Sequence, residues 1–263
     1  SRRPRFRCMK SLIVLSGGLD SLVALAKSVR ETQLVEAITF DYGQRAGEQE
    51  LRAARAISEF YSVPWRSIDL PFLKDVTQTA LVNRDRDVPE VLAADLDRGA
   101  EFAQGTAREV WIPNRNGVFL AIAADIAESK NIDQIVTGFN AEEAETFPDN
   151  SLAFVEAANK AFKLSTLTHP RVVSPLGGLN KVGIVRLGLE LNAPFHLMYS
   201  CYMGDPTPCG KCESCARMRR AFKEAGIEVN DFLRTSEALG GVGVGAPGEG
   251  RPIPQRVSRK PEQ

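Results

Sequence analysis

A short apolar run, residues 12–15, is followed at once by the turn Ser16-Gly17-Gly18-Leu19-Asp20-Ser21 and then by a helical pattern from about residue 20 to residue 30. A second apolar run of strand length, residues 34–40, comes next. Strand-length apolar runs separated by helical periodicity indicate a βαβ unit, in which a helix joins two parallel strands. This opening favours an α/β fold with a buried parallel sheet.

The same alternation continues along the rest of the chain. A second helix is predicted where apolar residues recur at helical spacing, at Leu51, Ala54, Ile57 and Tyr61. Further strands are predicted at 64–70, 134–139 and 171–176, and further helices at about 116–130, 151–167, after Asn180 and at 213–225. We therefore expect a Rossmann-like parallel sheet with helices on both faces.

Charge and composition narrow the class of partner. Lys+Arg and Asp+Glu are both 33 among 263 residues, so the formal net charge is zero, and the hydrophobic fraction is 43%. Without a net positive charge the protein has no overall electrostatic attraction to nucleic acid or an anionic membrane, so we expect a small-molecule substrate. The run at 12–15 is also too short for a membrane span or a signal-peptide core, so we expect a cytoplasmic protein.

The turn at 16–21 suits a phosphate or pyrophosphate. Its two glycines let backbone N–H groups approach an anion, Ser16 and Ser21 add hydroxyl donors, and the following helix N-terminus adds partial positive charge. The spacing is neither Gly-x-Gly-x-x-Gly nor a Walker P-loop, which would end in Gly-Lys-Ser/Thr. The alternative is an ordinary helix cap made by Asp20 or Ser21.

Four of the five cysteines fall within fifteen residues, in the pattern Cys-x7-Cys-x2-Cys-x2-Cys: Cys201, Cys209, Cys212 and Cys215. Four closely spaced soft ligands suit a tetrahedral metal ion, for which Zn²⁺ is the natural occupant. With no open coordination position, the predicted zinc is structural and contributes to folding. An iron–sulfur cluster is the alternative.

Five motifs in chain order carry a family resemblance. They are the turn at 16–21, Phe40-Asp41-Tyr42-Gly43-Gln44-Arg45, Pro113-Asn114-Arg115-Asn116, Gly138-Phe139-Asn140-Ala141 and the four-cysteine cluster. Together, from about residue 12 to residue 222, they resemble the QueC family of 7-cyano-7-deazaguanine synthases. That family belongs to the PP-loop, or N-type ATP pyrophosphatase, superfamily, so the resemblance implies an adenine nucleotide alpha hydrolase-like sheet and a C-terminal zinc-binding segment.

The resemblance also implies an activity. The expected reaction is the ATP-dependent conversion of 7-carboxy-7-deazaguanine to 7-cyano-7-deazaguanine with ammonia, through an adenylated acid and an amide, in queuosine or 7-deazapurine biosynthesis. The enzyme would be a ligase that forms C–N bonds, cleaves ATP to AMP and pyrophosphate, and uses Mg²⁺ and a structural Zn²⁺. The family also implies a homodimer.

Roles for particular residues follow. The ATP-binding set is Leu15, Ser16, Gly17, Gly18, Leu19, Asp20, Ser21 and Leu22, and the catalytic set is Ser16, Asp20, Arg115 and Lys181. The substrate-binding set is Tyr42, Gln44, Arg45, Arg115, Asn116, Gly138, Asn140, Phe147 and Asp149. On chemical grounds Arg115 suits a carboxylate or phosphate, Asn140 a purine-like edge and Phe147 a flat ring. Their alternatives are a surface ion pair, a turn residue and a core residue.

We expect four segments along the chain. They are a basic N-terminal extension at 1–11, a PP-loop ATP pyrophosphatase domain at 12–195, a zinc-binding helical segment at 196–237 and a flexible tail rich in glycine and proline at 238–263. Residues 71–110 are rich in charge and poorly periodic, so they are either a cover over the site or an ordinary surface insertion.

Some positions depart from the family pattern. Ala46 stands where a histidine usually follows Gln-Arg, and Asn114 replaces a glycine before Arg-Asn. Residues 143–151 read Glu-Ala-Glu-Thr-Phe-Pro-Asp-Asn-Ser instead of Asp-Tyr-Ser-Gly-Tyr-Pro-Asp-Cys-Arg. The alternative function is therefore a related ligase that adenylates the same acid and transfers it to another amine, for example on a protein. A tRNA-modifying PP-loop enzyme and a non-catalytic zinc-bearing module are further alternatives.

Overall fold

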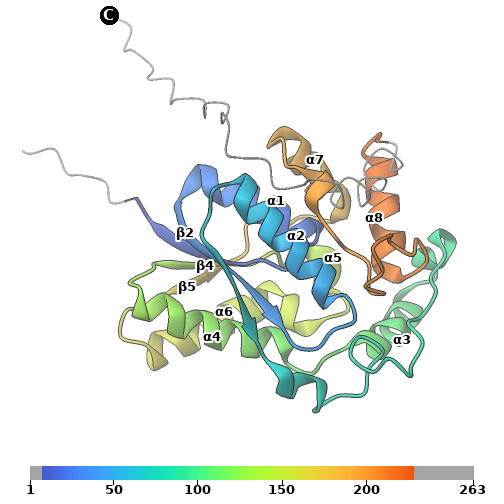
Figure 1. Ribbon diagram of the computed structural model, residues 1–263, viewed down its shortest axis with the longest axis horizontal. Coiled ribbons are helices and arrows are strands. Elements are labelled where there is room, and N and C mark those ends of the chain that lie inside the picture. The colour runs from blue at the N-terminus through green and yellow to red at the C-terminus, as the bar shows by residue number, and fades with distance from the viewer. Residues whose placement is uncertain (1–7, 228–263) are drawn as a thin grey trace, which may run out of the picture.

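The computed structural model describes residues 8–227. Five strands form one parallel sheet in the order β3-β2-β1-β4-β5 (Figure 1). The strands are β1 Lys10–Val14, β2 Gln33–Asp41, β3 Trp65–Asp69, β4 Gln134–Val136 and β5 Arg171–Val173. The strand order reverses between β1 and β4, and in open parallel sheets ligands bind where it does, outside the carboxyl ends of the strands. The predicted Rossmann-like α/β fold is confirmed.

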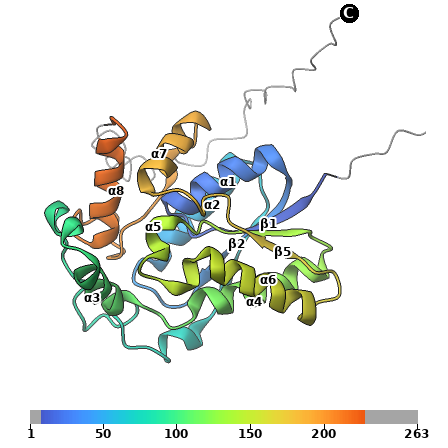
Figure 2. The same cartoon turned by 180° about the vertical axis from the view of Figure 1, so that it is seen from behind.

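Helices cover both faces of the sheet, as the two opposite views show (Figures 1 and 2). On one face lie α1 Leu19–Glu31, α2 Gly47–Phe60, α7 Lys181–Glu190 and α8 Glu213–Glu224. On the other lie α4 Arg115–Ser129 and α6 Leu152–Ser165, while α3 Ala100–Val110 and α5 Ala141–Ala144 lie outside this packing. Four 3-10 helices are η1 Pro71–Lys74, η2 Ala93–Asp97, η3 Pro148–Asn150 and η4 Phe195–Leu197.

Successive residues of β1 serve two different cores. Leu12 packs in the cluster that contains Leu120 and Ala123 of α4, whereas Ile13 packs in the cluster that contains Leu22 of α1. Both β1 side chains are fully buried, because a strand in the middle of a parallel sheet has no solvent-facing side. Burial of each contributes about 1.5–3 kcal/mol, so β1 and the turn that follows it are rigidly held.

Two strands end earlier than the sequence predicts. β4 stops at Val136 and β5 at Val173, whereas the predicted strands extend to 139 and 176. Beyond them two hydrogen bonds still connect the two segments: the Thr137 N–H donates to the Val173 carbonyl, 3.0 Å, and the Ser174 side-chain hydroxyl donates to the Phe139 carbonyl, 2.6 Å. Residues 137–139 and 174–176 thus continue beyond the paired strands, at the carboxyl edge of the sheet.

The segment at 71–110 leaves the sheet after β3 and runs to the cysteine-rich segment. The Val91 N–H donates to the Lys211 carbonyl, 2.8 Å, and Glu90 forms an isolated antiparallel bridge with Cys212. In both views its helix α3 lies near α8. Leu81 and Val110 from this segment line the main cavity, so it covers the site as the first of the two interpretations predicts.

The chain after residue 195 shares the core of the sheet. Phe222 of α8 packs edge-on against Phe195, with ring centroids 5.1 Å apart, in the cluster that also contains α1. The proposed division between 12–195 and 196–237 therefore does not separate two cores. Most of the predicted extension at 1–11 and all of the tail at 238–263 lie outside the described residues. Within residues 8–227, no helix has the length and apolar character needed to cross a membrane.

Candidate active site and cysteine centre

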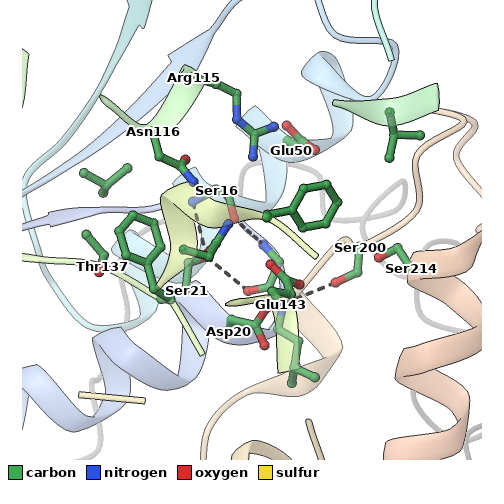
Figure 3. Close-up of a pocket in the computed structure, with 18 of the residues that line it drawn as sticks. Ser16, Asp20, Ser21, Glu50, Arg115, Asn116, Thr137, Glu143, Ser200 and Ser214 are labelled. Atoms are coloured by element: carbon green, nitrogen blue, oxygen red, sulfur yellow. Dashed lines mark hydrogen bonds between the residues drawn. The ribbon is translucent and has the colours of Figure 1, made fainter. Parts of the chain in front are cut away.

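A cavity of about 250 Å³ opens at the carboxyl edge of the sheet, where β1 and β4 end (Figure 3). Its walls come from the turn after β1, the end of β2, the start of α4, the α5 region, α7 and α8. Among the predicted site residues, the cavity is lined by Leu15, Ser16, Gly18, Leu19, Asp20, Ser21, Tyr42, Arg115, Asn116, Gly138, Phe147, Asp149 and Lys181. The fold thus gathers residues that are far apart in the sequence.

Two glycines let the turn pack closely. Gly17 has φ +82°, and a Cβ there would lie 2.7 Å from the Glu50 carbonyl oxygen on α2. A Cβ on Gly138, after β4, would lie 2.9 Å from the Ser21 backbone nitrogen. Both contacts are too short for any side chain, so the turn is held between α2 and the end of β4.

The turn presents several hydrogen-bond donors. The Ser16 N–H donates to the Ser21 Oγ, 3.2 Å, the Gly18 N–H to the Ser16 Oγ, 3.3 Å, and the Leu19 N–H to the Ser200 Oγ, 3.2 Å. Helix α1 begins after Gly18 without any side-chain cap. The alternative interpretation, in which Asp20 or Ser21 simply caps this helix, is therefore wrong.

A buried lysine sits between two carboxylates. The Lys181 Nζ lies 2.5 Å from the Asp20 Oδ2 and 2.5 Å from the Glu143 Oε1. Burial lowers the pKa of Lys181, but the two carboxylates outweigh this effect and hold the pKa above its usual value. Burial raises the pKa of Glu143, but Lys181 outweighs it, so the Glu143 pKa is lowered.

The pKa of Asp20 shifts in the opposite direction from that of Glu143. Burial and the nearby Glu143 raise the pKa of Asp20 to about 6, although Lys181 opposes the shift. Its second oxygen, Oδ1, is buried and has no hydrogen-bond partner in the described part of the chain. An unsatisfied buried carboxylate oxygen costs free energy in the absence of a ligand, and it suits a divalent cation.

A second ionic layer ties this lysine to α8. Glu142 accepts from the Lys181 backbone N–H at 3.0 Å and from the Arg217 Nη1 at 2.7 Å, and Arg217 also pairs with Glu213 at 2.7 Å. Burial raises the pKa of Glu142, but the bonds from Lys181 and Arg217 outweigh it and lower that pKa. The Asp20 carboxylate is thus connected through Lys181 and Glu142 to α8, the helix that contains Cys215.

Arg115 begins α4 and provides a fixed positive charge on another wall. Its Nη1 donates to the Tyr42 hydroxyl at 2.9 Å, and its guanidinium lies 5.5 Å from the Tyr42 ring and 5.8 Å from the Phe119 ring. Its Nε is buried without a hydrogen-bond partner among residues 8–227. In Figure 3 Arg115 and Asp20 stand well apart on the cavity wall. The guanidinium therefore suits an anionic group of a substrate distant from Asp20.

Neighbouring residues fix the start of α4 and provide flat walls. Asp149 Oδ2 accepts from the Asn116 backbone N–H at 3.1 Å, and the Asn116 side-chain amide donates to the Asp149 carbonyl at 3.2 Å.

Phe147 stacks on Trp111 with ring centroids 5.7 Å apart and planes 12° apart. Parallel aromatic faces suit a planar heterocycle.

Five predicted site residues do not line the cavity. Gln44 is buried, where it accepts from the Tyr42 N–H at 2.8 Å and donates to the Phe40 carbonyl, and Arg45 donates to the carbonyls of Ala80, Asn83 and Arg86. Asn140 is fully buried and caps α5 by accepting from the Glu143 N–H at 3.0 Å. Leu22 belongs to the core, and Gly17 supports the turn from behind. Direct substrate contacts for Gln44, Arg45 and Asn140 are therefore not supported.

The departures from the family pattern have structural explanations. Asn114 has φ +53°, a left-handed conformation that glycine and asparagine tolerate best, so it serves the same turn as the usual glycine. Ala46 is 3% exposed and packs against the cysteine-rich segment, and Glu145 is exposed. None of these three lines the cavity; within 143–151, the residues that do are Glu143, Thr146, Phe147, Asp149 and Asn150.

Sequence reasoning missed several residues of the cavity wall. The main ones are Glu50, Trp111, Ser200, Ser214 and Arg217. Only Ser214 lies within a recognised motif, between Cys212 and Cys215. The others reach the cavity through the packing of α2, of the chain around Trp111, of the segment before Cys201 and of α8. The one signal available was the position of Ser200, directly before the first clustered cysteine.

The four predicted metal ligands converge. The sulfur atoms of Cys201, Cys209, Cys212 and Cys215 all lie within 4.8 Å of one another. Backbone N–H groups of Met203 and Cys209 donate to the Cys201 Sγ, at 3.4 and 3.3 Å, and those of Lys211 and Cys212 donate to the Cys209 Sγ, at 3.4 and 3.3 Å. Hydrogen bonds from Cys212 and Cys215 lower the pKa of Cys201. Four sulfur atoms that converge in this way are able to bind a metal ion.

Known structures resemble the chain only distantly. NMN synthetase from Francisella tularensis is 18% identical, covering 92% of this chain and 81% of that one, with a TM-score of 0.43. A 4-thiouridine synthetase in complex with RNA and ATP is 21% identical, covering 88% and 52%, with a TM-score of 0.42.

Sequence relatives are much closer. The 7-cyano-7-deazaguanine synthase of Methanosarcina barkeri is 47% identical over 222 residues, 84% of this chain and 96% of the relative. That of Pelotomaculum thermopropionicum is 49% identical over 221 residues, 84% and 100% of the two chains. The family model described as queuosine biosynthesis protein QueC matches residues 10–226. The chain belongs to the QueC family.

Proposed function

We propose that the protein converts 7-carboxy-7-deazaguanine to 7-cyano-7-deazaguanine with ammonia and cleaves ATP to AMP and pyrophosphate. The observation that carries the proposal is one cavity, in a QueC-family chain, that contains both the glycine-serine turn and the buried Arg115. Curated relatives at 47–49% identity have the name of this activity. The product would enter queuosine or 7-deazapurine biosynthesis.

The turn would bind the pyrophosphate end of ATP. Without a ligand the Ser16 and Gly18 N–H groups and the Ser21 hydroxyl donate to acceptors within the turn, and a bound pyrophosphate would take over such donors. The N-terminus of α1 adds partial positive charge. The unpartnered Asp20 Oδ1 suits Mg²⁺, which when bound would offset the phosphate charge. Lys181 would hold Asp20 in place and keep the net charge of the acidic pair low.

Arg115 would hold the acid group of the substrate. The guanidinium is buried, charged and oriented by Tyr42, which satisfies the requirements for pairing with a carboxylate. The planar deazapurine would lie beside the stacked Phe147 and Trp111. Contacts of the substrate with Asn116, Gly138 and Asp149 belong to the same proposal.

The proposed chemistry has two rounds. The carboxylate oxygen attacks the α-phosphorus of ATP and pyrophosphate leaves; ammonia then attacks the carbonyl carbon, AMP leaves, and nitrogen loses a proton to give the amide. The amide oxygen attacks a second ATP in the same way. Loss of the two remaining N–H protons and cleavage of the C–O bond release AMP and leave the nitrile. In both rounds an oxygen on the same carbon atom attacks the α-phosphorus of an ATP molecule bound in the same place, so one site serves both.

The cysteine centre would hold Zn²⁺ in a structural role. Four thiolates fit a closed tetrahedral site, which leaves no position for substrate, and no step of the proposed reaction uses the metal. A homodimer and a cytoplasmic location remain predictions.

Nothing in the comparisons favours the alternative ligase, which would pass the acid to another amine, for example on a protein. Of the departures that suggested it, Ala46, Asn114 and Glu145 do not line the cavity. Transfer to another amine therefore enters only as an outcome of the test.

The test is mass spectrometry of the products formed from ATP, Mg²⁺, 7-carboxy-7-deazaguanine and ammonium. We expect the nitrile with two AMP and two pyrophosphate per molecule. Amide accumulating with one AMP, despite excess ATP, would replace the synthase with an enzyme that stops at ligation. Release of ADP and phosphate would reject the PP-loop assignment altogether.

A further inference from the structure

A two-residue link connects the cysteine centre to the phosphate turn. The Tyr199 N–H donates to the Gly17 carbonyl at 2.9 Å, and the next residue, Ser200, accepts from the Leu19 N–H at 3.2 Å (Figure 3). The residue after Ser200 is Cys201, the first sulfur ligand of the cysteine centre. The turn is therefore held on one side by a segment that is 181 residues away from it in the sequence.

The Ser200 hydroxyl faces the same space as the donors of the turn. It lines the cavity, and a Cβ built on Gly18 would lie 3.4 Å from the Ser200 Oγ and 3.5 Å from the Ser16 Oγ. The hydroxyls of Ser16 and Ser200 thus flank the middle of the turn. An anion bound over Gly18 would lie between them.

The hydrogen bonds of the three hydroxyls around the turn differ. Ser21 donates its proton to the Gly18 carbonyl at 3.1 Å, and Ser16 and Ser21 share a contact of 3.1 Å. Ser200 uses a lone pair to accept from Leu19, and its own O–H has no acceptor within the described part of the chain. A hydroxyl can donate one bond while it accepts others, so Ser200 retains a proton for an anion at the turn.

We propose that Ser200 is a pyrophosphate-binding residue that the cysteine-rich segment contributes to the ATP site. The proposal rests on the proposed function, because it takes the turn as the site of the pyrophosphate end of ATP. Its hydroxyl fixes the Leu19 N–H and donates to the same phosphate group as the turn. Folding of the cysteine centre, through Cys201, sets the position of this hydroxyl.

The experiment compares two variants of nearly equal shape, Ser200→Thr and Ser200→Val, with Ser165→Ala as a control. Threonine keeps the hydroxyl and valine removes it, whereas Ser165 is exposed at the end of α6 and does not line the cavity. The readouts are the Kd of inorganic pyrophosphate with Mg²⁺, the KM of ATP and of 7-carboxy-7-deazaguanine, and the metal content. All are measured on the full-length, metal-loaded protein.

We expect Ser200→Val to weaken pyrophosphate binding and raise the KM for ATP by about tenfold, as loss of one bond to a charged group does. Ser200→Thr and Ser165→Ala should stay within about twofold of wild type, and the metal content and the KM for the deazapurine acid should not change. Equal affinities of the threonine and valine variants would overturn the proposal. Wild-type protein that fails to bind pyrophosphate would instead overturn the proposed function on which it rests.

Discussion

The cysteine centre and the main cavity are assembled over very different distances along the chain. The four sulfurs come from residues 201–215, whereas the cavity wall runs from Val14 to Met218. A tight spacing of ligands limits the geometries that the backbone can adopt, so spacing alone predicts convergence. No such limit acts between Asp20 and Arg217, whose connection depends on the packing of α5, α7 and α8. Local sites can therefore be read from a sequence more securely than cavities can.

The first prediction tests the local site and has the largest expected effect. Cys212→Ser should remove the bound metal and cause loss of soluble folded protein, because Cys212 is buried and also begins α8. Soluble yield, circular dichroism and metal analysis are the measurements. Cys8→Ser is the matched control, since Cys8 is exposed and distant in sequence from the cluster. A soluble, fully active, metal-free protein would show that the centre is not structural.

The second prediction concerns the local part of the cavity. Asp20→Ala should lower the rate of pyrophosphate release by about 10²–10³-fold, because an oriented charge at the reacting phosphates is lost. The metal content and the fold should be retained. The measurement is release of AMP and pyrophosphate, with Asp125→Ala on the exposed side of α4 as control. Unchanged turnover would remove Asp20 from the site.

These two sites also show what the sequence could predict. Apolar periodicity was sufficient for the strands, and the turn at 16–21 lay where it was expected, because both depend on neighbouring residues. Helix α3 was missed, since its segment is rich in charge and weakly periodic. Gln44 and Asn140 were assigned to the substrate because they belong to motifs, yet their side chains accept hydrogen bonds from the backbone N–H groups of Tyr42 and Glu143. A motif can be required for folding as much as for binding.

The third prediction tests the long-range part of the cavity. Arg217→Ala should raise the KM for ATP by about tenfold, since Glu142 would lose the cation that orients it toward Lys181. The free energy of unfolding should fall by about 1–3 kcal/mol, because two carboxylates lose a partly buried partner. Steady-state kinetics and chemical denaturation are the measurements. Arg55→Ala is the control, because its pair with Glu59 is exposed and should contribute little.

The fourth prediction concerns pH. Burial raises the pKa of Asp20 to about 6 from its usual value of 3.8, so the folded protein binds this proton more tightly than the unfolded chain. This tighter proton binding stabilises the folded protein fully below about pH 4, and the stabilisation is lost as the pH rises through about 6. Relative to Asp20→Asn, which does not titrate, wild type should therefore lose stability across this window and change little above it. Denaturation of both proteins from pH 4 to pH 8 is the measurement, and parallel curves would show that the shift is absent.

The smallest expected effect separates a folding role from a binding role in one motif. Arg45 was assigned to the substrate, but its guanidinium donates to the Ala80 and Asn83 carbonyls, at 2.6 and 2.8 Å, and so ties the covering segment to the end of β2. Arg45→Lys keeps the charge but loses the planar set of donors that reaches several carbonyls at once. Chemical denaturation should show a loss of about 1–2 kcal/mol, because buried carbonyls lose partners.

The KM of this variant for 7-carboxy-7-deazaguanine should stay within about twofold of wild type, since Arg45 does not line the cavity. Arg115→Lys provides the contrast. Arg115 lines the cavity, and its buried Nε has no hydrogen-bond partner within residues 8–227. There the KM for the acid should rise by about tenfold or more, as a bidentate partner of a carboxylate is lost. If Arg45→Lys raised this KM as much as Arg115→Lys while leaving stability unchanged, the residue would act on the substrate, and the distinction between motif residues that fold and those that bind would fail at this position.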